Sequence, residues 1–255
     1  IQALQAQSHH FLREVAHLPL HSVPQLLLTA SQASRPALFD HAVQAMLLCG
    51  AMMDAEGGST AELRMALLCG LLHDLGEMYI DPRYGEADAD RELDILSYQQ
   101  LVVHPHVGHL LIAQLTNYPA ALARAIAEHH ERLDGSGYPH GLQRDGISPL
   151  GRMVAVAEGT LGVLRASERP HLARASVALR VVPGEFDLNW VQAIEAAARA
   201  QPPHRASLSL PAVQSRLGRL DTALQVAQAS ADALSPKAES PHFKGAVLLT
   251  QHLLG

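Results

Sequence analysis

Lysine is almost missing from this 255-residue sequence, which contains it only at Lys237 and Lys244. Any chemistry in the first 236 residues must therefore do without an ammonium group. The sequence also lacks an excess of positive charge, because 25 acidic residues outnumber 19 lysines and arginines and give a formal net charge of −6. This balance argues against a surface that neutralises a nucleic-acid backbone or coats an anionic membrane.

Long apolar runs and strand signals are missing as well. No apolar run approaches the ~20 residues that span a bilayer, and no basic flank leads into an apolar signal stretch. We therefore expect no membrane partner and a cytoplasmic location. Cys49 and Cys69 are the only cysteines. Their apolar helical surroundings predict buried thiols in a reducing compartment and no disulfide.

Runs of good helix formers predict an all-α fold. Residues 41–53 and 60–75 are expected to form core helices, with Thr60 as an N-cap. Further helices are expected over residues 93–103, 104–115 after a break at Pro105, 119–133 with Pro119 in the first turn, 150–165 and 187–200. Residues 133–149 are dense in Gly, Pro, Asp and Ser, which predicts a long loop of the kind that often carries function.

We expect three parts along the chain: an N-terminal helical segment over residues 1–36, a main domain over 37–200 and a C-terminal helical extension over 201–255. The extension contains a heptad-like seam of apolar or small residues, formed by Val213, Leu217, Leu220, Leu224, Ala227, Ala231 and Leu234. This spacing favours either a helix that forms a homodimer or one that packs on the main domain. A short apolar helix is expected to end the chain.

Histidine is unusually frequent, with 16 residues gathered in a few segments. His73 and Asp74 end an apolar helix, and neighbouring helical side chains point about 100° apart. An imidazole and a carboxylate placed in this way can bracket a cation, and the carboxylate can bridge two. By itself the pair is weak evidence, because a capped helix end explains it equally well.

Other histidines and one glutamate can complete such a site. A buried imidazole pair or carboxylate without a partner would cost stability, and a bound metal removes that cost. Each has an ordinary alternative: His41 can be exposed at a helix start, and Glu158 can pair with Arg152 or Arg165. Together, seven donors from five separated segments favour a binuclear metal centre. They are His41, His73, Asp74, His104, His129, His130 and Glu158. His106 and His109 are candidates for supporting the ligands.

Three strings carry a resemblance to a known family. HDLGE at 73–77, HPHVG at 104–108 and HHERLDGSGYP at 129–139 resemble the signatures of HD-GYP domains, a branch of the HD phosphohydrolases. ISPLGRMVAVAE and the Arg169–Pro170 pair are similar to the family's continuing pattern, so the likeness runs from about His41 to about Ala197. It implies an HD-type helical bundle with flanking N-terminal and C-terminal helices, in which residues 37–200 form a metal-dependent phosphohydrolase domain.

The resemblance also implies an activity, the hydrolysis of cyclic di-GMP by a water that two metal ions activate. Iron or manganese would be bound by the seven donors, with Asp74 bridging the ions and taking part in catalysis. Gly135 and Gly137 would let the loop take positive φ, and Tyr138 would offer its ring to a ligand or a signalling protein. The implied substrate or partner loop comprises Asp134, Gly135, Gly137, Tyr138 and Pro139.

The largest departure from the family is Glu77, which stands where members have a lysine that reaches the substrate phosphate. We therefore count Glu77 with Asp74 as a catalytic position. A like charge at ~4 Å, with an effective dielectric of about 20, would cost on the order of 4 kcal/mol before relaxation. Three outcomes remain open: Glu77 rotates to solvent, pairs with Arg83 or ligates a metal itself.

Smaller departures concern the metal ligands. Glu158 replaces an aspartate, and its extra methylene moves the carboxylate by ~1 Å or more, which disturbs the spacing of two ions. Gly162 stands where members often have an acidic residue. Ala37 replaces the glutamate with which some members bind a third metal, so we expect two ions at most.

Two classes of function follow from these observations. The first is a metal-dependent cyclic di-GMP phosphodiesterase of reduced efficiency. The alternative is a catalytically inactive signalling module that binds a nucleotide or a protein partner through the Tyr138 loop and the C-terminal seam. A third class, a phosphohydrolase acting on a mononucleotide, is disfavoured by the GYP loop.

Overall fold

The computed structural model describes residues 8–81, 95–167, 170–201 and 210–234. The chain divides into two compact units, Ile1–Pro202 and Pro203–Gly255. Every element among the described residues is helical and none is a strand, which confirms the predicted all-α fold.

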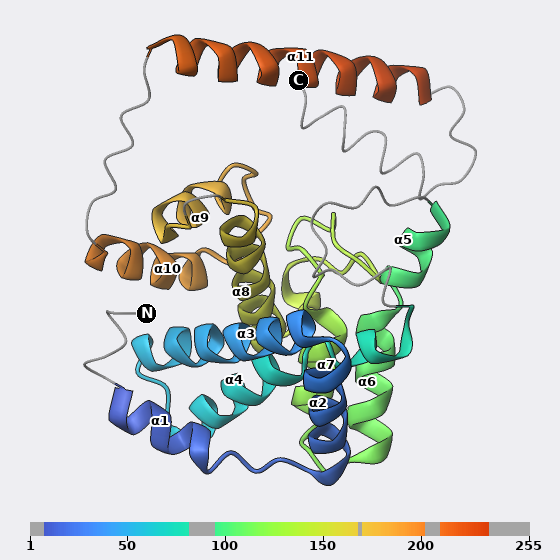
Figure 1. The fold of residues 1–255 in the computed structure, drawn as a ribbon, viewed down its shortest axis with the longest axis vertical. Helices are drawn as coiled ribbons and strands as arrows, with labels where there is room; N and C mark the ends of the chain where they lie inside the picture. Colours follow the sequence, from blue (N-terminus) through green and yellow to red (C-terminus); the bar gives the residue numbers. More distant parts are fainter. Residues whose placement is uncertain (1–7, 82–94, 168–169, 202–209, 235–255) are drawn as a thin grey trace. The chain divides into compact units, whose positions relative to one another are not determined.

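The first unit contains ten α-helices and two 3-10 helices in the residues described (Figure 1). In chain order they are α1 (Ser8–Ala16), α2 (Ser22–Ser34), α3 (Pro36–Ala55), α4 (Thr60–Leu72), η2 (Leu75–Tyr79), α5 (Ile95–Leu101), α6 (His104–Leu115), α7 (Ala120–Glu128), η4 (Arg144–Gly146), α8 (Pro149–Arg165), α9 (Leu172–Ala178) and α10 (Leu188–Ala200). Helix α3 packs along α4 and α6 along α7, while α8 contacts α3, α4 and α7. Helix α9 was not predicted.

The core centres on α3 and α4. Both helices are apolar around most of their circumference, which is typical of helices buried on several sides. Leu67 and Leu72 of α4 are completely buried, as are the thiols of Cys49 and Cys69. Both cysteines are free, as expected. Burial raises the pKa of Cys69 to about 12, because a thiolate would be poorly solvated there.

Helix α4 begins and ends at residues other than those predicted. Ser59, and not Thr60, is its N-cap: the Ser59 hydroxyl accepts a hydrogen bond from the Glu62 N–H, and the Glu62 carboxylate accepts one from the Ser59 N–H. This reciprocal pair is a capping box. The helix ends at Leu72, before His73 and Asp74.

Helix α7 is also shorter than predicted. Pro119 is its N-cap and the helix ends at Glu128 rather than at residue 133. His129 and His130 therefore lie in the turn that follows. A side chain in a turn can point in more directions than one inside a helix. The early ends of α4 and α7 therefore affect how the candidate metal donors that follow them are directed.

Helix α3 contradicts one expectation. It spans 20 residues and contains an 18-residue window with a mean hydropathy of 1.2, so by length and composition alone it is able to cross a membrane. The statement that no apolar run approaches this length was wrong. Half of that window is buried inside the fold, and core helices of soluble proteins pass the same test. The helix is weak evidence for a membrane span.

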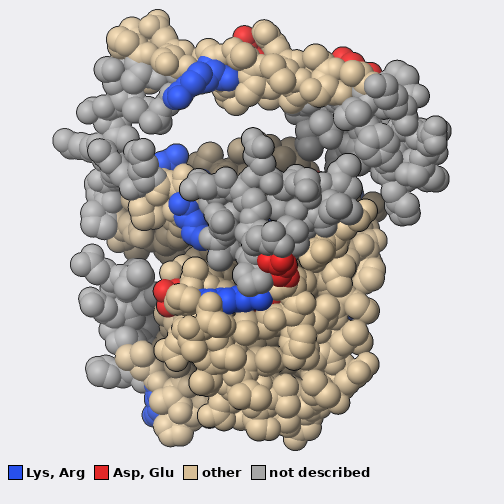
Figure 2. Space-filling model, turned by 45° about the vertical axis from the view of Figure 1, so that its right-hand side comes forward, with Lys and Arg blue, Asp and Glu red and all other residues tan. Residues whose placement is uncertain are grey.

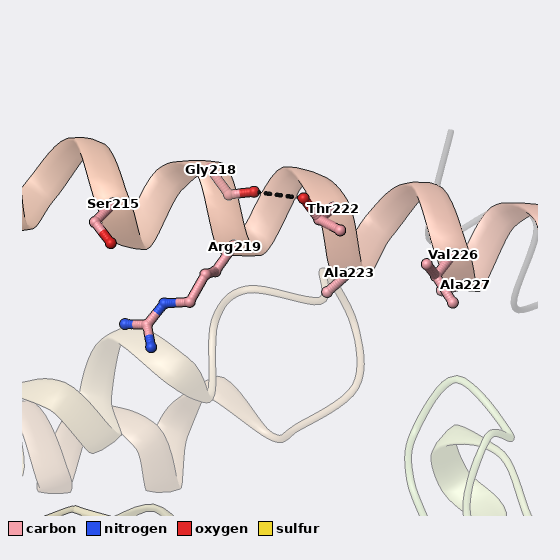
Figure 3. Close-up of a pocket in the computed structure, with 7 residues that line it drawn as sticks. All are labelled: Ser215, Gly218, Arg219, Thr222, Ala223, Val226 and Ala227. Atoms are coloured by element: carbon pink, nitrogen blue, oxygen red, sulfur yellow. Dashed lines mark hydrogen bonds between the residues drawn. The ribbon is translucent and has the colours of Figure 1, made fainter.

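The second unit contains α11 (Leu210–Leu234), which includes the predicted seam. Three seam residues are well exposed, Leu217 at 59%, Leu220 at 55% and Leu224 at 44%. Figure 3 shows a strip of mostly small side chains on this helix, with Arg219 projecting from it, and Thr222 Oγ1 donates to the Gly218 carbonyl at 2.9 Å. The short helix expected at the end of the chain lies outside the described residues.

Candidate metal centre

All seven predicted donors lie together in the fold. Their ligand atoms form two groups of four, and within each group all the atoms lie within 4.8 Å of one another. Each of the seven residues is at most 5% exposed. The histidine-rich group consists of Asp74, His104, His129 and His130. The carboxylate-rich group consists of His41, His73, Asp74 and Glu158.

Asp74 belongs to both groups and turns one oxygen toward each. Its Oδ1 lies 3.4 Å from His104 Nε2 and 3.3 Å from His129 Nε2. Its Oδ2 lies 3.4 Å from His41 Nε2 and 3.1 Å from His73 Nε2. Neither buried oxygen has a well-aligned hydrogen bond within the protein. A carboxylate held in this way fits the space between two cations.

Three of the histidines are oriented by the same device. In His73, His104 and His129, Nδ1 lies 2.6–2.8 Å from the backbone carbonyl three residues earlier. Because a carbonyl only accepts, each Nδ1 carries a proton and each Nε2 faces the centre, where a neutral ring offers its lone pair. Nε2 of His104 and Nε2 of His129 lie only 3.1 Å apart. Two facing lone pairs repel each other, so this arrangement fits a cation, and carbonyl-bound rings are typical of metal ligands.

Gly76 allows the turn after Asp74 to approach α6. A Cβ atom at this position would lie 2.0 Å from the His104 carbonyl oxygen and 2.8 Å from the Gly108 nitrogen. Any larger residue would push η2 away from the start of α6. The glycine of HDLGE therefore brings Asp74 and His104 within reach of each other.

Glu158 uses its two oxygens differently. Oε2 lies 2.7 Å from His41 Nε2 and 3.2 Å from His73 Nε2. Oε1 accepts a hydrogen bond from Arg165 Nη2 at 3.1 Å. Glu158 thus combines the two roles considered for it. Its Oε2 is placed as a donor toward a cation, and its Oε1 pairs with an arginine. Arg152, the other candidate partner, pairs elsewhere.

The two groups differ in their electrostatics. Burial lowers the pKa of His129 to about 4 and lowers that of His130 as well. Burial would also lower the pKa of His73, but the adjacent carboxylates of Asp74 and Glu158 raise it well above its ordinary value. Burial opposes ionisation of these two acids, yet the neighbouring histidines hold both of their pKa values well below the usual range. In the protein alone, burial thus favours neutral imidazoles at His129 and His130, whereas the two carboxylates favour a protonated His73.

Glu77 is buried, with 2% of its surface exposed, so the expectation that it rotates to solvent was wrong. It lies in η2, three residues after Asp74, and belongs to neither donor group. Arg83, its other expected partner, lies outside the described residues. The backbone carbonyls of Glu77 and Ile80 both accept hydrogen bonds from Arg35. Sequence reasoning missed Arg35, because a contact across more than 40 residues leaves no local signal.

The two glycines of the GYP loop act differently. Gly135 has a φ of +86°, as expected for a residue that reverses the chain. Gly137 does not have a positive φ, so that expectation was wrong. A Cβ there would lie 2.4 Å from the His130 carbonyl oxygen, so the glycine is required for close backbone approach instead.

The remaining loop residues fold back toward the centre. The Tyr138 ring stacks on His130 with 4.5 Å between centroids, and the Tyr138 N–H donates to the His130 carbonyl. Tyr138 thus covers the histidine-rich group rather than projecting outward. Asp134 accepts a hydrogen bond from the Ser136 N–H at 2.9 Å, and Pro139 follows Tyr138 through a cis peptide bond.

Two buried glutamates that the sequence analysis did not single out hold this loop. Glu131, 1% exposed, accepts hydrogen bonds from the N–H groups of His140 at 2.7 Å and Leu142 at 2.8 Å. Glu128 accepts one from the Ser148 N–H at 2.7 Å. Glu128 ends α7 and Glu131 follows three residues later, so the loop is tied to the turn that carries the histidine pair. Glu131 lies within HHERLDG and Glu128 directly precedes this string, which was the available signal.

His106 and His109 do not support the ligands in the way expected. Their rings stack on each other, and His109 Nδ1 lies 3.0 Å from the Ala123 carbonyl of α7. Neither residue belongs to the two donor groups. His106 is exposed and His109 is half-buried.

Comparisons with known proteins agree with this geometry. A family model described as HD domain matches residues 28–185. Cyclic di-GMP phosphodiesterase PA4108 of Pseudomonas aeruginosa is 36% identical over 99 residues, which cover 38% of this chain and 23% of that protein. 3'3'-cGAMP-specific phosphodiesterase 1 of Vibrio cholerae is 29% identical over 163 residues, which cover 63% of this chain and 36% of that protein. The chain therefore spans well under half the length of these relatives.

A solved structure shows the same fold. Bd1817, described as a HDG"Y"P protein from Bdellovibrio bacteriovorus, has a TM-score of 0.53 and 21% identity and covers 62% of this chain and 51% of its own. The matched family region spans more than half of this chain and includes all seven donors. The resemblance inferred from the three strings is thus confirmed, and the chain belongs to the HD domain family.

Proposed function

We propose that this chain is a metal-dependent phosphodiesterase that hydrolyses cyclic di-GMP or a closely related cyclic dinucleotide. The observation that carries this proposal is the pair of four-donor groups that share Asp74, with one oxygen turned toward each. The names of the similar proteins, which refer to cyclic di-GMP and to 3'3'-cGAMP, support the substrate class. We assign the activity to residues 37–200, with flanking segments over 1–36 and 201–255.

Two divalent transition metal ions fit the donor set, and we propose iron or manganese. Mixed imidazole and carboxylate ligation suits both metals. The buried Asp74 oxygens without hydrogen bonds and the facing Nε2 atoms of His104 and His129 also fit cations. When bound, such a pair supplies Lewis-acid activation of water and neutralises charge on phosphoryl oxygens.

The protein's own groups prepare this site for a phosphodiester. Backbone carbonyls fix the imidazole rings of His73, His104 and His129, and Asp74 bridges the two donor groups. Stacking of Tyr138 on His130 shields the histidine-rich group from water. On the face shown in Figure 2, the described arginines lie in small separate groups and form no continuous basic surface. The cations held in the centre are therefore the main positive charge that we propose for substrate binding.

The test is an assay of the full chain after anaerobic loading with manganese or iron. Incubation with cyclic di-GMP should give the linear dinucleotide or GMP. His73→Ala and Asp74→Ala should abolish turnover and reduce the metal content. A chain that contains no transition metal under these conditions would contradict the proposal.

A non-catalytic signalling module is the second candidate, and the burial of Glu77 near the centre favours it. In that case the metal-loaded chain binds the nucleotide without turnover. The loop over Asp134, Gly135, Gly137, Tyr138 and Pro139 would then contact a signalling protein, and the exposed leucines of α11 would hold a homodimer. Sedimentation of a chain truncated after Pro203 tests the dimer. We place either function in the cytoplasm, which the two free thiols support.

A further inference from the structure

Glu158 is held from two sides. Its Oε2 faces His41 and His73, as described above, and its Oε1 accepts a hydrogen bond from Arg165. Arg165 lies seven residues later at the end of α8, so the two side chains emerge from the same face of the helix two turns apart. The carboxylate is 5% exposed and the Arg165 side chain 27% exposed. The guanidinium thus links a buried donor to the protein surface.

The length of Glu158 makes this double contact possible. An aspartate at the same position is shorter by one methylene and loses ~1 Å or more of reach. One carboxylate oxygen would then fall short of either the histidines or the guanidinium. A partly exposed ion pair contributes little to folding stability. The main effect of Arg165 therefore falls on the orientation of the Glu158 carboxylate.

We infer that Arg165 is a positioning residue that makes Glu158 present a single oxygen, Oε2, to a cation in the carboxylate-rich group. This inference rests on the proposed metal-dependent function. Because Arg165 occupies one lone pair of Oε1 and fixes the carboxylate, Oε2 is the oxygen that Glu158 presents to an ion. The fixed rotamer lowers the entropy cost of binding the ion, since a free glutamate would have to be ordered first.

Two effects of Arg165 on metal affinity oppose each other. Its contact orders the carboxylate, which favours binding, whereas its positive charge offsets part of the negative charge that attracts the ion. Partners of metal ligands typically change affinity by about 10–100-fold when they are removed, and the change is usually a loss. We therefore expect orientation to outweigh charge at Glu158.

Titration of the metal-free full chain with Mn²⁺, followed by electron paramagnetic resonance of the free ion, tests this inference. Arg165→Met removes the charge but keeps most of the length. One of the two ions should bind about tenfold more weakly or worse, while the other is unaffected. Arg165→Lys, which keeps the positive charge, should lose less Mn²⁺ affinity than Arg165→Met. Tighter or unchanged binding in Arg165→Met overturns the inference.

Arg199→Met is the control, because Arg199 forms an exposed pair with Glu195 on α10 outside both donor groups, and this variant should bind both ions as the wild type does. A double-mutant cycle adds a second test. In a Glu158→Asp background, Arg165→Met should cause little further loss, and a full additional tenfold loss overturns the inference. Wild-type protein that takes up no Mn²⁺ overturns both this inference and the proposed function. Wild-type protein that binds two ions, together with an unaffected Arg165→Met, overturns only the role of Arg165.

Discussion

The two donor groups share Asp74 but balance charge in different ways. In the histidine-rich group, three imidazoles supply the donors, and burial keeps His129 and His130 neutral near pH 7. In the carboxylate-rich group, two acids face His73, whose pKa they raise. A cation that enters the first group meets lone pairs, whereas one that enters the second has to displace a proton. Donor chemistry therefore leaves lone pairs in one half of the centre and balances the carboxylates with a histidine proton in the other half.

The two groups also differ in what separates them from solvent. Tyr138 and the loop tied down by Glu131 cover the histidine-rich group. The carboxylate-rich group lies against the α3–α4 core and reaches the surface through Arg165. One side is closed by a loop and the other by a salt bridge. Loss of either cover should affect one group before the other.

Removing the shared residue should have the largest effect, because it damages both groups at once. Asp74→Asn keeps the shape but loses the bridging charge. Two-metal activation is worth several kcal/mol, so turnover of cyclic di-GMP should fall by about 10³-fold or more. Elemental analysis should find less than two metal ions per chain. An Asn variant with full metal content and normal turnover would show that Asp74 does not bridge.

Damage to one group at a time should separate the two halves. His104→Ala affects only the histidine-rich group and His41→Ala only the carboxylate-rich group. Each variant should retain one manganese ion and lose about 10²-fold in turnover, since one ion cannot replace the pair. Electron paramagnetic resonance should show an isolated ion in place of a coupled pair. If both variants lose both ions, the two groups are not separate sites.

Changing the charge at residue 77 should have a smaller effect. Glu77→Gln removes a buried negative charge near Asp74, and Glu77→Lys reverses it. Turnover should rise by about tenfold in the first variant and further in the second. A tenfold change corresponds to about 1.4 kcal/mol, which is well below the bare Coulomb energy of about 4 kcal/mol per contact. Steady-state kinetics with cyclic di-GMP measures this. No gain in either variant would locate the limitation elsewhere, for example at Glu158.

Loosening the loop should affect the cover of the histidine-rich group alone. Glu131→Gln replaces one of two acceptor oxygens with a donor, which leaves the N–H of His140 or Leu142 poorly satisfied. Unfolding free energy should fall by about 1–3 kcal/mol, and cleavage by protease within residues 133–149 should become faster. Thermal melts and mass spectrometry of the fragments measure both. Glu195→Gln, on the surface of α10, serves as the control.

An effect confined to alkaline pH concerns the α3–α4 core under the carboxylate-rich group. The pKa of Cys69 is raised to about 12 in the folded chain. In the unfolded chain the pKa of a cysteine thiol is about 8.5. The contribution of the neutral, buried thiol to stability is therefore fully present below that pH. The free energy of unfolding then falls by about 1.4 kcal/mol per pH unit as pH rises from 8.5 toward 12. Urea melts at pH 8 and 10 should show this loss, and Cys69→Ala should reduce it. An equal loss in the variant would assign it to other groups, such as Cys49.

Much of this molecule was predictable from local patterns. Apolar helix formers indicated the core helices, and the strings around His73, His104 and His129 gave five of the seven candidate donors. The errors that bear on the donors concern helix ends: α4 and α7 stop before the predicted residues, which places His73 and His129 in turns. Sequence alone could not show this, since a helix continues until its backbone groups find better partners in the tertiary structure.

The sequence by itself determined the all-helical fold and the presence of a long loop, and it named the seven candidate donors that the fold brings together, because periodicity and motif spacing are local properties. Only the tertiary structure decided which Asp74 oxygen faces which group, that Glu77 is buried and that Glu158 pairs with Arg165 rather than with Arg152. Three of the elements involved, α3, η2 and α8, are separated by tens of residues along the chain. Their contacts depend on how helices pack, and a one-dimensional pattern reports which face of a helix is apolar but not what lies against it.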